Sequence, residues 1–587
     1  MLAFVAIEPI KNLVVETKIG VQFYPYSYRY FIDTFPQNVF SATYNQFSEG
    51  GGYSTDVRWT NKISYDIRLK GIHRISAFAA YESSKATSRS NQGTVTDLPY
   101  TTPGYLNLAN GTFNPTIPMT GSSGNENSTS IFGNINYSLM DKYLVAFVAR
   151  RDGSSKFGPL NRYGNFFSYS GGWRISKEKF LENISWIDDL KLRAAYGENG
   201  NNAIPADLYL DRYTLSGYVN YSSYDLDGTN NSAFTGAGLY QLGNPYIHWE
   251  TNKTTNLGFD AALFKNKLAV SFSWFNRITK DLLAVPPITG LRGDALAPFE
   301  NIMEFSNKGI ELELGYQNKI GGLGYDMNFN IATYRNNVNY ISSDKDAHID
   351  GSAYAPTAFS LTRSVVGMPV STFYGYIQEG IFQSADEYTR NGVAHTGLTA
   401  ATAAGHFKFR DLNGDKKINA DDRTYIGNPH PKFTFGYNLN LNYRNFDLGV
   451  FVQGVSGNKI FNYWRVNSVF PGALGEGAND TWSATNTDAK LPIWDNVSSE
   501  DKLPSSFFIE DGSYLRLKSL QLGYTLSPKN AFNKIRIYVQ GYNLATIAGY
   551  SGIDPEISNG SATNVGVDFG GNYPISRRFV VGVNFGL

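Results

Sequence analysis

The residues best suited to bind an ion lie in an acidic, turn-rich segment between positions 411 and 422, which reads Asp-Leu-Asn-Gly-Asp-Lys-Lys-Ile-Asn-Ala-Asp-Asp. Oxygen donors at loop positions 1, 3, 5, 9 and 12, with a backbone carbonyl at position 7, are the ligand spacing of a calcium loop. Glycine at position 4 instead of 6, and Asp instead of Glu at position 12, depart from the standard loop. Either these oxygens bind calcium, or the Asp and Asn side chains hydrogen-bond their own backbone in turns. The predicted ligands are Asp411, Asn413, Asp415, the backbone carbonyl of Lys417, Asn419 and Asp422.

A second candidate chemistry is the binding of sugar rings by aromatic side chains in long polar segments. An aromatic ring offers an apolar face for such stacking, but the same ring can instead pack one loop against another. The sequence leaves both interpretations open. The candidates are Tyr374, Trp464, Trp482 and Trp494.

Catalytic chemistry is poorly supported. The six histidines are scattered without a metal-ligand spacing, and cysteine is absent, which excludes disulfides and thiol chemistry. Glycoside hydrolysis needs two carboxyl groups about 5–10 Å apart, and no sequence pattern places two of them so. We therefore expect a protein that is not an enzyme, with no catalytic residues and no cofactor other than possible calcium.

The composition points away from nucleic acid and towards an interface with lipid. Lys and Arg number 51, as do Asp and Glu, so the basic surface that nucleic acid requires is not indicated. Aromatic residues make up 15% of the chain, with 40 Tyr and 39 Phe. Tyrosine is favoured where an apolar environment meets water, as at a membrane surface. No run of about 18 apolar residues predicts a membrane-spanning helix.

The elements that must position these residues show a two-residue rhythm. Successive side chains of a strand point to opposite faces, so alternation predicts one apolar and one polar face. A soluble sandwich buries the apolar face, whereas a membrane barrel turns it to lipid and keeps the polar face for its lumen. Alternation is clearest over residues 268–274, 310–316, 325–331 and 432–443. On this pattern Asp260, Glu311, Glu313, Asp326 and Arg536 face the lumen. At the end of one strand, the charged residues either contact an anionic lipid head group or a substrate, or are solvated rim charges, which we favour; they are Arg150, Arg151, Asp152 and Lys156.

Short and long connections alternate along the chain. Short turns at one end of the strands and long loops at the other are typical of outer-membrane barrels, so we expect a barrel in preference to a soluble sandwich. Tight turns are predicted at residues 9–12, 70–72, 140–142, 265–267, 318–322 and 444–445, and one helical turn within 176–189. The long loops are expected at 91–128, 199–240, 343–430 and 460–505.

Counting alternating runs gives about 17 strands, from residues 2–8 to residues 577–587. Single-chain bacterial barrels have an even number of strands. An odd count is therefore expected of the C-terminal part of a longer barrel. In the last strand, Val581, Val583, Phe585 and Leu587 alternate with glycine and asparagine, as in terminal strands of outer-membrane barrels.

Several sequence blocks resemble SusC/RagA-type TonB-dependent transporters of Bacteroidetes, and they occur in the family's order over residues 1–587. The blocks are Arg-Arg-Asp-Gly-Ser-Ser-Lys-Phe-Gly at 150–158, Gly-Asn-Pro-Tyr-Ile-His-Trp-Glu-Thr at 243–251, Asn-Lys-Gly-Ile-Glu-Leu at 307–312, Phe-Arg-Asp-Leu-Asn-Gly-Asp-Lys-Lys-Ile-Asn at 409–419, Ser-Tyr-Leu-Arg-Leu-Lys-Ser-Leu-Gln-Leu-Gly-Tyr at 513–524, and the pair at 538–544 and 550–556.

This resemblance implies a transmembrane antiparallel barrel of 22 strands in the Gram-negative outer membrane, with long extracellular loops and short periplasmic turns. Residues 1–587 would be its C-terminal part. The signal peptide, the carboxypeptidase-like extension and the plug domain would lie outside this sequence. The implied function is import of an oligosaccharide or peptide, with a SusD-like surface lipoprotein, the TonB complex and outer-membrane lipid as partners.

Three alternatives remain at this point. A siderophore or cobalamin receptor has the same architecture but a different substrate. A passive porin or adhesin would need a closed barrel without a plug. A soluble carbohydrate-binding β protein would bury its apolar faces in a core.

Overall fold

The computed structural model describes residues 1–34, 44–113, 119–215, 223–225, 233–235, 237–286, 295–342, 346–352, 359–468, 480–495, 500–527, 534–557, 563–570 and 573–586. These residues form two compact units. The first comprises Met1–Gly171, Tyr196–Asn252 and Ile288–Asn301, and the second comprises Gly172–Ala195, Lys253–Pro287 and Ile302–Leu587. Leu587 itself and the side chain of Trp464 lie outside the described residues.

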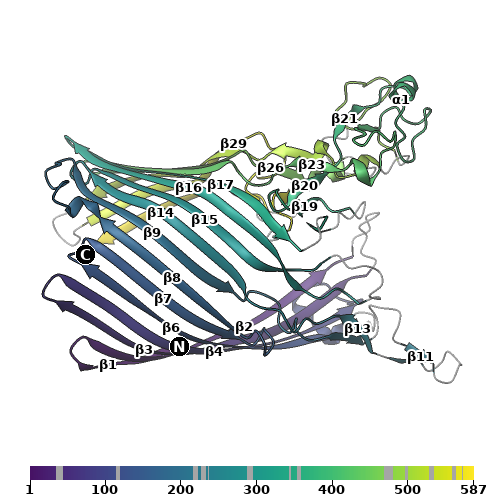
Figure 1. Ribbon diagram of the computed structural model, residues 1–587. Helices are drawn as coiled ribbons and strands as arrows, with labels where there is room; N and C mark the ends of the chain where they lie inside the picture. Colours follow the sequence, from purple (N-terminus) through teal and green to yellow (C-terminus); the bar gives the residue numbers. More distant parts are fainter. Residues whose placement is uncertain are drawn as a thin grey trace. The chain divides into compact units, whose positions relative to one another are not determined.

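Long antiparallel strands dominate both units (Figure 1). Seventeen strands in the described part of the chain have nine residues or more, as the alternating runs predicted. They are β1 (Leu2–Ile10), β2 (Leu13–Ile32), β3 (Gln46–Leu69), β4 (His73–Thr96), β6 (Thr120–Leu139), β7 (Tyr143–Ser154), β8 (Tyr163–Arg174), β9 (Ile187–Asn201), β14 (Glu250–Leu263), β15 (Leu268–Ala284), β16 (Glu300–Ile320), β17 (Leu323–Ile341), β24 (Phe433–Tyr443), β25 (Phe446–Ser456), β28 (Tyr514–Leu526), β29 (Lys534–Ala548) and β31 (Arg578–Gly586).

Shorter elements lie in the connections. The strands are β5 (Thr112–Phe113), β10 (Arg212–Leu215), β11 (Ser223–Asp225), β12 (Ala233–Thr235), β13 (Ala237–Gln241), β18 (His348–Asp350), β19 (Thr362–Val365), β20 (Thr372–Gly375), β21 (Gln378–Ile381), β22 (Phe407–Phe409), β23 (Thr424–Gly427), β26 (Lys459–Asn462), β27 (Ile509–Asp511) and β30 (Val567–Asp568). The helices are α1 (Ala385–Asn391), α2 (Tyr463–Ser468) and short 3₁₀ turns such as η4 (Ile175–Lys177), η6 (Ala420–Asp422) and η8 (Glu500–Lys502). None of the helices in the described ranges has the length and apolar character needed to cross a membrane.

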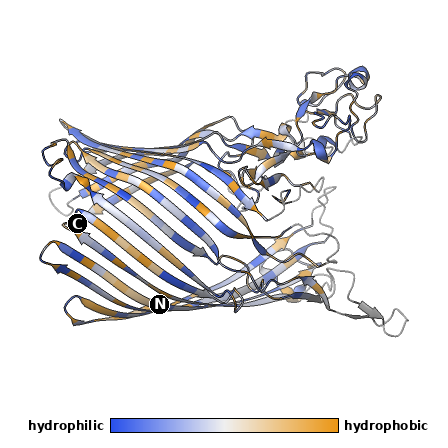
Figure 2. Cartoon of the chain, viewed as in Figure 1, coloured by the Kyte–Doolittle hydropathy of each residue, from blue (hydrophilic) through white to orange (hydrophobic). Residues whose placement is uncertain are grey.

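Strand pairing keeps the two faces of the sheet chemically distinct. In the second unit Met327 lies opposite Leu439, which lies opposite Val450 on the next strand. One residue further along, Asn328 is paired with Asn438. Because a register slip of one residue would exchange the two faces, this pairing confirms the predicted alternation. Figure 2 shows hydrophobic and hydrophilic residues alternating along the long strands.

The tight turns lie where the sequence predicts them. β1 and β2 are joined by two residues, as are β16 and β17 and also β24 and β25. Asn12, Asp141 and Arg444 have positive φ angles, which two- and three-residue hairpin connections require. β1 is paired only with β2, and β31 only with β29, among the described residues.

Buried hydrophobic clusters lie in the loop segments and at the loop ends of strands. One contains Phe373, Phe461 and Phe508, and another contains Phe47, Val95 and Leu98. By contrast, Val539 is 51% exposed and Val581 is 71% exposed on the long strands β29 and β31. An apolar sheet face left open in this way suits lipid, and it contradicts a soluble sandwich, which would bury that face.

Candidate functional site

The polar face of the first unit forms a cavity of about 450 Å³. Even-numbered residues of neighbouring strands share this face, because side chains alternate along a strand. Arg150 donates to Asp152 at 2.6 Å and to the Ser130 hydroxyl at 3.0 Å. The lining also includes Arg58, Glu82, Phe166, Ser168, Glu198, Asn199 and Trp249. The result is a wall with both signs of charge and an aromatic edge, which suits a hydrated substrate better than an apolar one.

The charged residues of 150–156, which are expected as solvated rim charges, have different surroundings in the structure. Arg150 and Asp152 line the cavity, and their mutual pairing keeps the half-buried guanidinium neutralised. Arg151 lies on the opposite face of β7, with its guanidinium over the ring of Tyr163 at 5.0 Å. Lys156 pairs with Glu126 at 3.3 Å. Alternation along β7 separates Arg150 from Arg151, so residues adjacent in sequence have different surroundings.

Trp249 connects two of the sequence blocks in the first unit. Its ring is stacked on Phe157 with centroids 4.8 Å apart, and it meets the edge of Phe166 at 5.7 Å. Its indole N–H donates to the carbonyl of Arg162 at 3.2 Å. The block at 150–158 and the block at 243–251 therefore meet at one aromatic contact beside the polar cavity.

Arg516 connects two further sequence blocks, which lie in the second unit. Its side chain is 1% exposed, and it donates to Asp554 at 2.7 Å and to Glu556 at 2.7 Å. A further bond runs to the hydroxyl of Thr546 at 2.9 Å. The arginine of the block at 513–524 thus fixes the loop that contains the block at 550–556.

Two of the charges predicted to face the lumen, Asp260 and Arg536, are paired within the second unit. Asp260 contacts Lys191 at 3.2 Å and Arg193 at 3.3 Å. Arg536 donates to Asp447 at 2.9 Å. These pairs lie on strands rather than in a cleft with a nucleophile, so their arrangement suits a charged wall.

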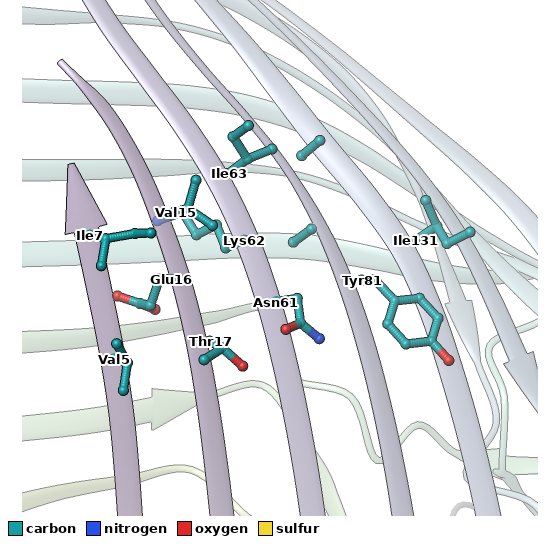
Figure 3. A pocket seen from close by; sticks show the side chains of 12 residues that line it. Val5, Ile7, Val15, Glu16, Thr17, Asn61, Lys62, Ile63, Tyr81 and Ile131 are labelled. Carbon is teal, nitrogen blue, oxygen red and sulfur yellow. The ribbon is translucent and has the colours of Figure 1, made fainter. Parts of the chain in front are cut away.

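The opposite face of the first unit is apolar, and Figure 3 shows part of it. Here a groove of about 480 Å³ runs across β1 to β6. Its apolar lining includes Val5, Ile7, Val15, Ile63 and Ile131. The two faces of this sheet therefore differ in polarity. The apolar face suits contact with lipid, and the polar face suits contact with a hydrated substrate.

The segment predicted to bind calcium is a series of backbone-capping turns. Asp411 accepts the backbone N–H groups of Gly414 and Lys416, at 2.7 and 2.8 Å. Asp422 is fully buried and accepts from the N–H groups of Leu412 and Asn419. The backbone N–H of Lys417 donates to Asp415, and this bond holds the pKa of the Asp415 carboxyl below its ordinary value.

These bonds match the alternative in which Asp and Asn side chains cap their own backbone. Within the described ranges, no group of three or more His, Cys, Asp or Glu side chains is arranged to hold a metal ion. The predicted calcium ligands also include asparagine side chains and a backbone carbonyl, which are not among these residue types. The calcium loop therefore stays a prediction.

The candidate aromatic residues have different surroundings. The ring of Tyr374 lies under the guanidinium of Arg363 at 4.2 Å and beside the ring of Tyr425. Trp482 is 9% exposed and donates to the side chain of Gln383 at 2.8 Å. Trp494 is 43% exposed. Packing accounts for the first two rings, so the prediction of a stacking surface is best carried by Trp494.

A buried ionisable cluster escaped the sequence analysis. His406, Asp501, Asp495 and Glu500 lie together in the second unit, although about 90 residues separate the histidine from the carboxylates. Neither their spacing nor their neighbours in sequence signals the contact. The inner-wall residues Arg58, Glu82 and Glu198 were also missed, but alternation from Arg150 and Asp152 would have found them.

Comparison with known proteins agrees with this geometry. The family described as "TonB dependent receptor-like, beta-barrel" matches residues 13–544. The TonB-dependent receptor P3 of Formosa agariphila is 32% identical over 90% of this chain and 52% of its own length. The TonB-dependent receptor SusC of Bacteroides thetaiotaomicron is 26% identical over 78% of this chain and 43% of its own.

A solved structure of the RagAB peptide transporter has the same fold. It superposes with a TM-score of 0.78 at 21% identity, covering 100% of this chain and 61% of that one. The chain spans about half the length of the curated relatives it matches. Its antiparallel strands, its split into a polar and an apolar face, and the family match lead to one conclusion: the chain belongs to the TonB-dependent receptor-like β-barrel family of the outer membrane.

Proposed function

We propose that this chain forms the barrel wall and the external loops of an outer-membrane importer for oligosaccharides or peptides. The observation that carries the proposal is the polar cavity, where Arg58, Glu82, Arg150, Asp152 and Glu198 line one wall. Such a wall offers hydrogen bonds of both kinds to a hydrated solute. An enzyme is not proposed, because the family that the chain matches consists of transporters.

The relatives support the same function. One is named SusC, and a structural neighbour is a peptide transporter, RagAB. By analogy, a SusD-like lipoprotein would dock on the long loops and the TonB complex would supply energy to the whole protein. A passive porin and a siderophore receptor are the competing functions.

Uptake by intact cells tests the proposal. The gene is deleted and restored in its host, and growth is measured on oligosaccharides, peptides and iron-limited medium. The proposal expects growth on one oligosaccharide or peptide class to fail in the deletion strain and to return with the gene. A defect confined to iron-limited medium would instead identify a siderophore receptor.

The cavity has its own test within that assay. Reversing the charge of Arg150 by R150E places a carboxylate beside Asp152 and should reduce uptake severalfold while the protein remains in the membrane. R151E is the matched control, since Arg151 lies on the opposite face of the same strand. Equal uptake by R150E and the unchanged protein would contradict a role for the cavity.

A further inference from the structure

A loop module of the second unit is built around two small hydrophobic clusters. Tyr376, Phe407 and Phe409 belong to one cluster, while Phe382 and Leu398 belong to the other. β21 and β22 pair to form its hairpin, and α1 follows β21. Figure 1 shows α1 and β21 beyond β20 and β23 of the same unit.

A strap, defined here as residues 480–495, lies across this module. The backbone N–H of Ile493 donates to the carbonyl of Gly405 at 2.7 Å. The indole N–H of Trp482 donates to Gln383. A β-carbon on Gly405 would lie 2.6 Å from the Trp482 ring and 2.7 Å from Ile493, so the strap rests directly on the module backbone.

His406 links the strap to the module from inside. Its side chain is 1% exposed. Nδ1 lies 2.6 Å from Asp501, and Nε2 lies 3.6 Å from Asp495, the last residue of the strap. Asp501 also accepts the backbone N–H of Phe407 at 2.8 Å. A protonated imidazole between two carboxylates is held by charge on both sides, whereas a neutral one satisfies only one of them.

We propose that His406, with Asp495 and Asp501, is a proton-dependent latch that holds the strap on the module and releases it when the imidazole loses its proton. The strap carries the exposed Trp494, so release changes how this ring is presented at the surface. The proposal concerns a conformational device and does not depend on the transported substrate.

The titration of the cluster agrees with the geometry in sign. Burial lowers the pKa of His406, but the hydrogen bond and the charge of Asp501, with Asp495 and Glu500, outweigh it and raise the pKa. A raised histidine pKa stabilises the folded module at pH values below the ordinary pKa of about 6.5. This stabilisation is lost as the pH rises through the raised pKa.

Glu500 also makes the folded module less stable as the pH rises. Burial raises its pKa to about 7, against the hydrogen bonds from Thr396 and the nearby His406. Its carboxyl is therefore neutral in the folded module at acidic pH and must become charged in a buried place as the pH rises through 7. Ionisation of Glu500 weakens the folded module between its ordinary pKa of 4.5 and about pH 7, and loss of the His406 proton weakens it further as the pH rises above about 6.5.

The remaining groups around the latch define the useful pH range. Burial lowers the pKa of His395, which accepts the backbone N–H of Phe409 and is therefore neutral at and above about pH 6.5. Asp422 lies near His395, and Lys408 pairs with Glu387 at 3.0 Å. Comparing about pH 6.5 with about pH 9 leaves His395 neutral throughout, so the comparison reports on His406 and Glu500.

The test measures a distance between the strap and the module in the full protein. Because the chain has no cysteine, spin labels are placed with T487C on the strap and T389C on α1. At about pH 6.5 the latch predicts one narrow distance distribution, and at about pH 9 a broader and longer one. H406Q should give the broad distribution at both pH values.

Two further variants keep the result interpretable. H348Q removes a histidine that lies 3.7 Å from Asp350, outside the strap, and should leave the pH response unchanged. E500Q removes a charge that raises the pKa of His406, so it should move the transition to lower pH while preserving release. An unchanged distance between the two pH values in the parent protein would overturn the latch, and so would a normal response in H406Q whose barrel is intact.

Discussion

At the scale of single residues, buried charges decide which distant segments come together. Arg516 is 1% exposed, so its guanidinium must find counter-charges inside the protein. Asp554 and Glu556 supply them from the last long loop. The arginine therefore makes the fold of that loop depend on strand β28.

Removing this arginine should destabilise the protein. R516M removes the arginine from Asp554 and leaves Glu556 with Lys518 at 2.8 Å, and we expect a loss of about 3 kcal/mol, the usual lower value for breaking a buried ion pair. Thermal unfolding in detergent, followed by electrophoretic mobility, measures the loss. R29M is the control because the Arg29–Glu49 pair has a guanidinium side chain that is 61% exposed, and an exposed pair contributes about 1 kcal/mol or less. Equal effects of R516M and R29M would refute the role of burial.

The calcium loop belongs to the same scale. If calcium binds, millimolar calcium should raise the unfolding temperature of the loop module and a chelator should reverse the effect, because a ligand that binds only the folded state stabilises it. D415N should abolish the response, while D386N, in α1 outside the loop, should preserve it. Absence of any calcium effect on the parent protein would leave the Asx turns as the whole explanation of this sequence.

At the scale of elements, each long strand has to satisfy two environments. The pairs Leu522–Val539 and Gln521–Gln540 are adjacent rungs of one ladder and present opposite faces. Adjacent rungs of an antiparallel ladder differ in their backbone hydrogen bonds, but these bonds lie within the sheet, so side-chain polarity sets which face meets lipid.

This difference predicts unequal effects of the same substitution on adjacent residues. V539R puts a charge on the apolar face and should cost about 2–4 kcal/mol if the site lies near the middle of the bilayer. Q540R puts it on the polar face and should cost much less. Folding of both variants into lipid vesicles under urea gives the comparison. A larger loss in Q540R would reverse the assignment of the two faces.

At the scale of the whole molecule, the proposed import requires energy from outside the barrel. In this proposal the inner wall would bind and guide a solute, but its paired charges would perform no work on the solute. We therefore expect that an uncoupler of the proton gradient stops accumulation of the substrate, although binding to the cells continues. Accumulation that is unaffected by the uncoupler would support a passive porin.

Much of the fold followed from the sequence because strands and tight turns depend on near neighbours. Alternation at 325–331 and 432–443 was confirmed by the pairing of β17 with β24, residue by residue. The turn at 444–445 was confirmed as the two-residue connection of β24 and β25. The contact of Arg150 and Asp152 with the cavity residues Arg58, Glu82 and Glu198 could not be predicted, because local spacing does not show which strands lie side by side.

The sequence by itself determined the strands, their two faces and the family, since covalent neighbours set the alternation of side chains. Only the tertiary structure decided that Arg516 holds residues 38 and 40 positions away, and that His406 meets Asp501 across 95 positions. Such contacts depend on the path of the loops through space. Their energies come from burial, which no short stretch of sequence records.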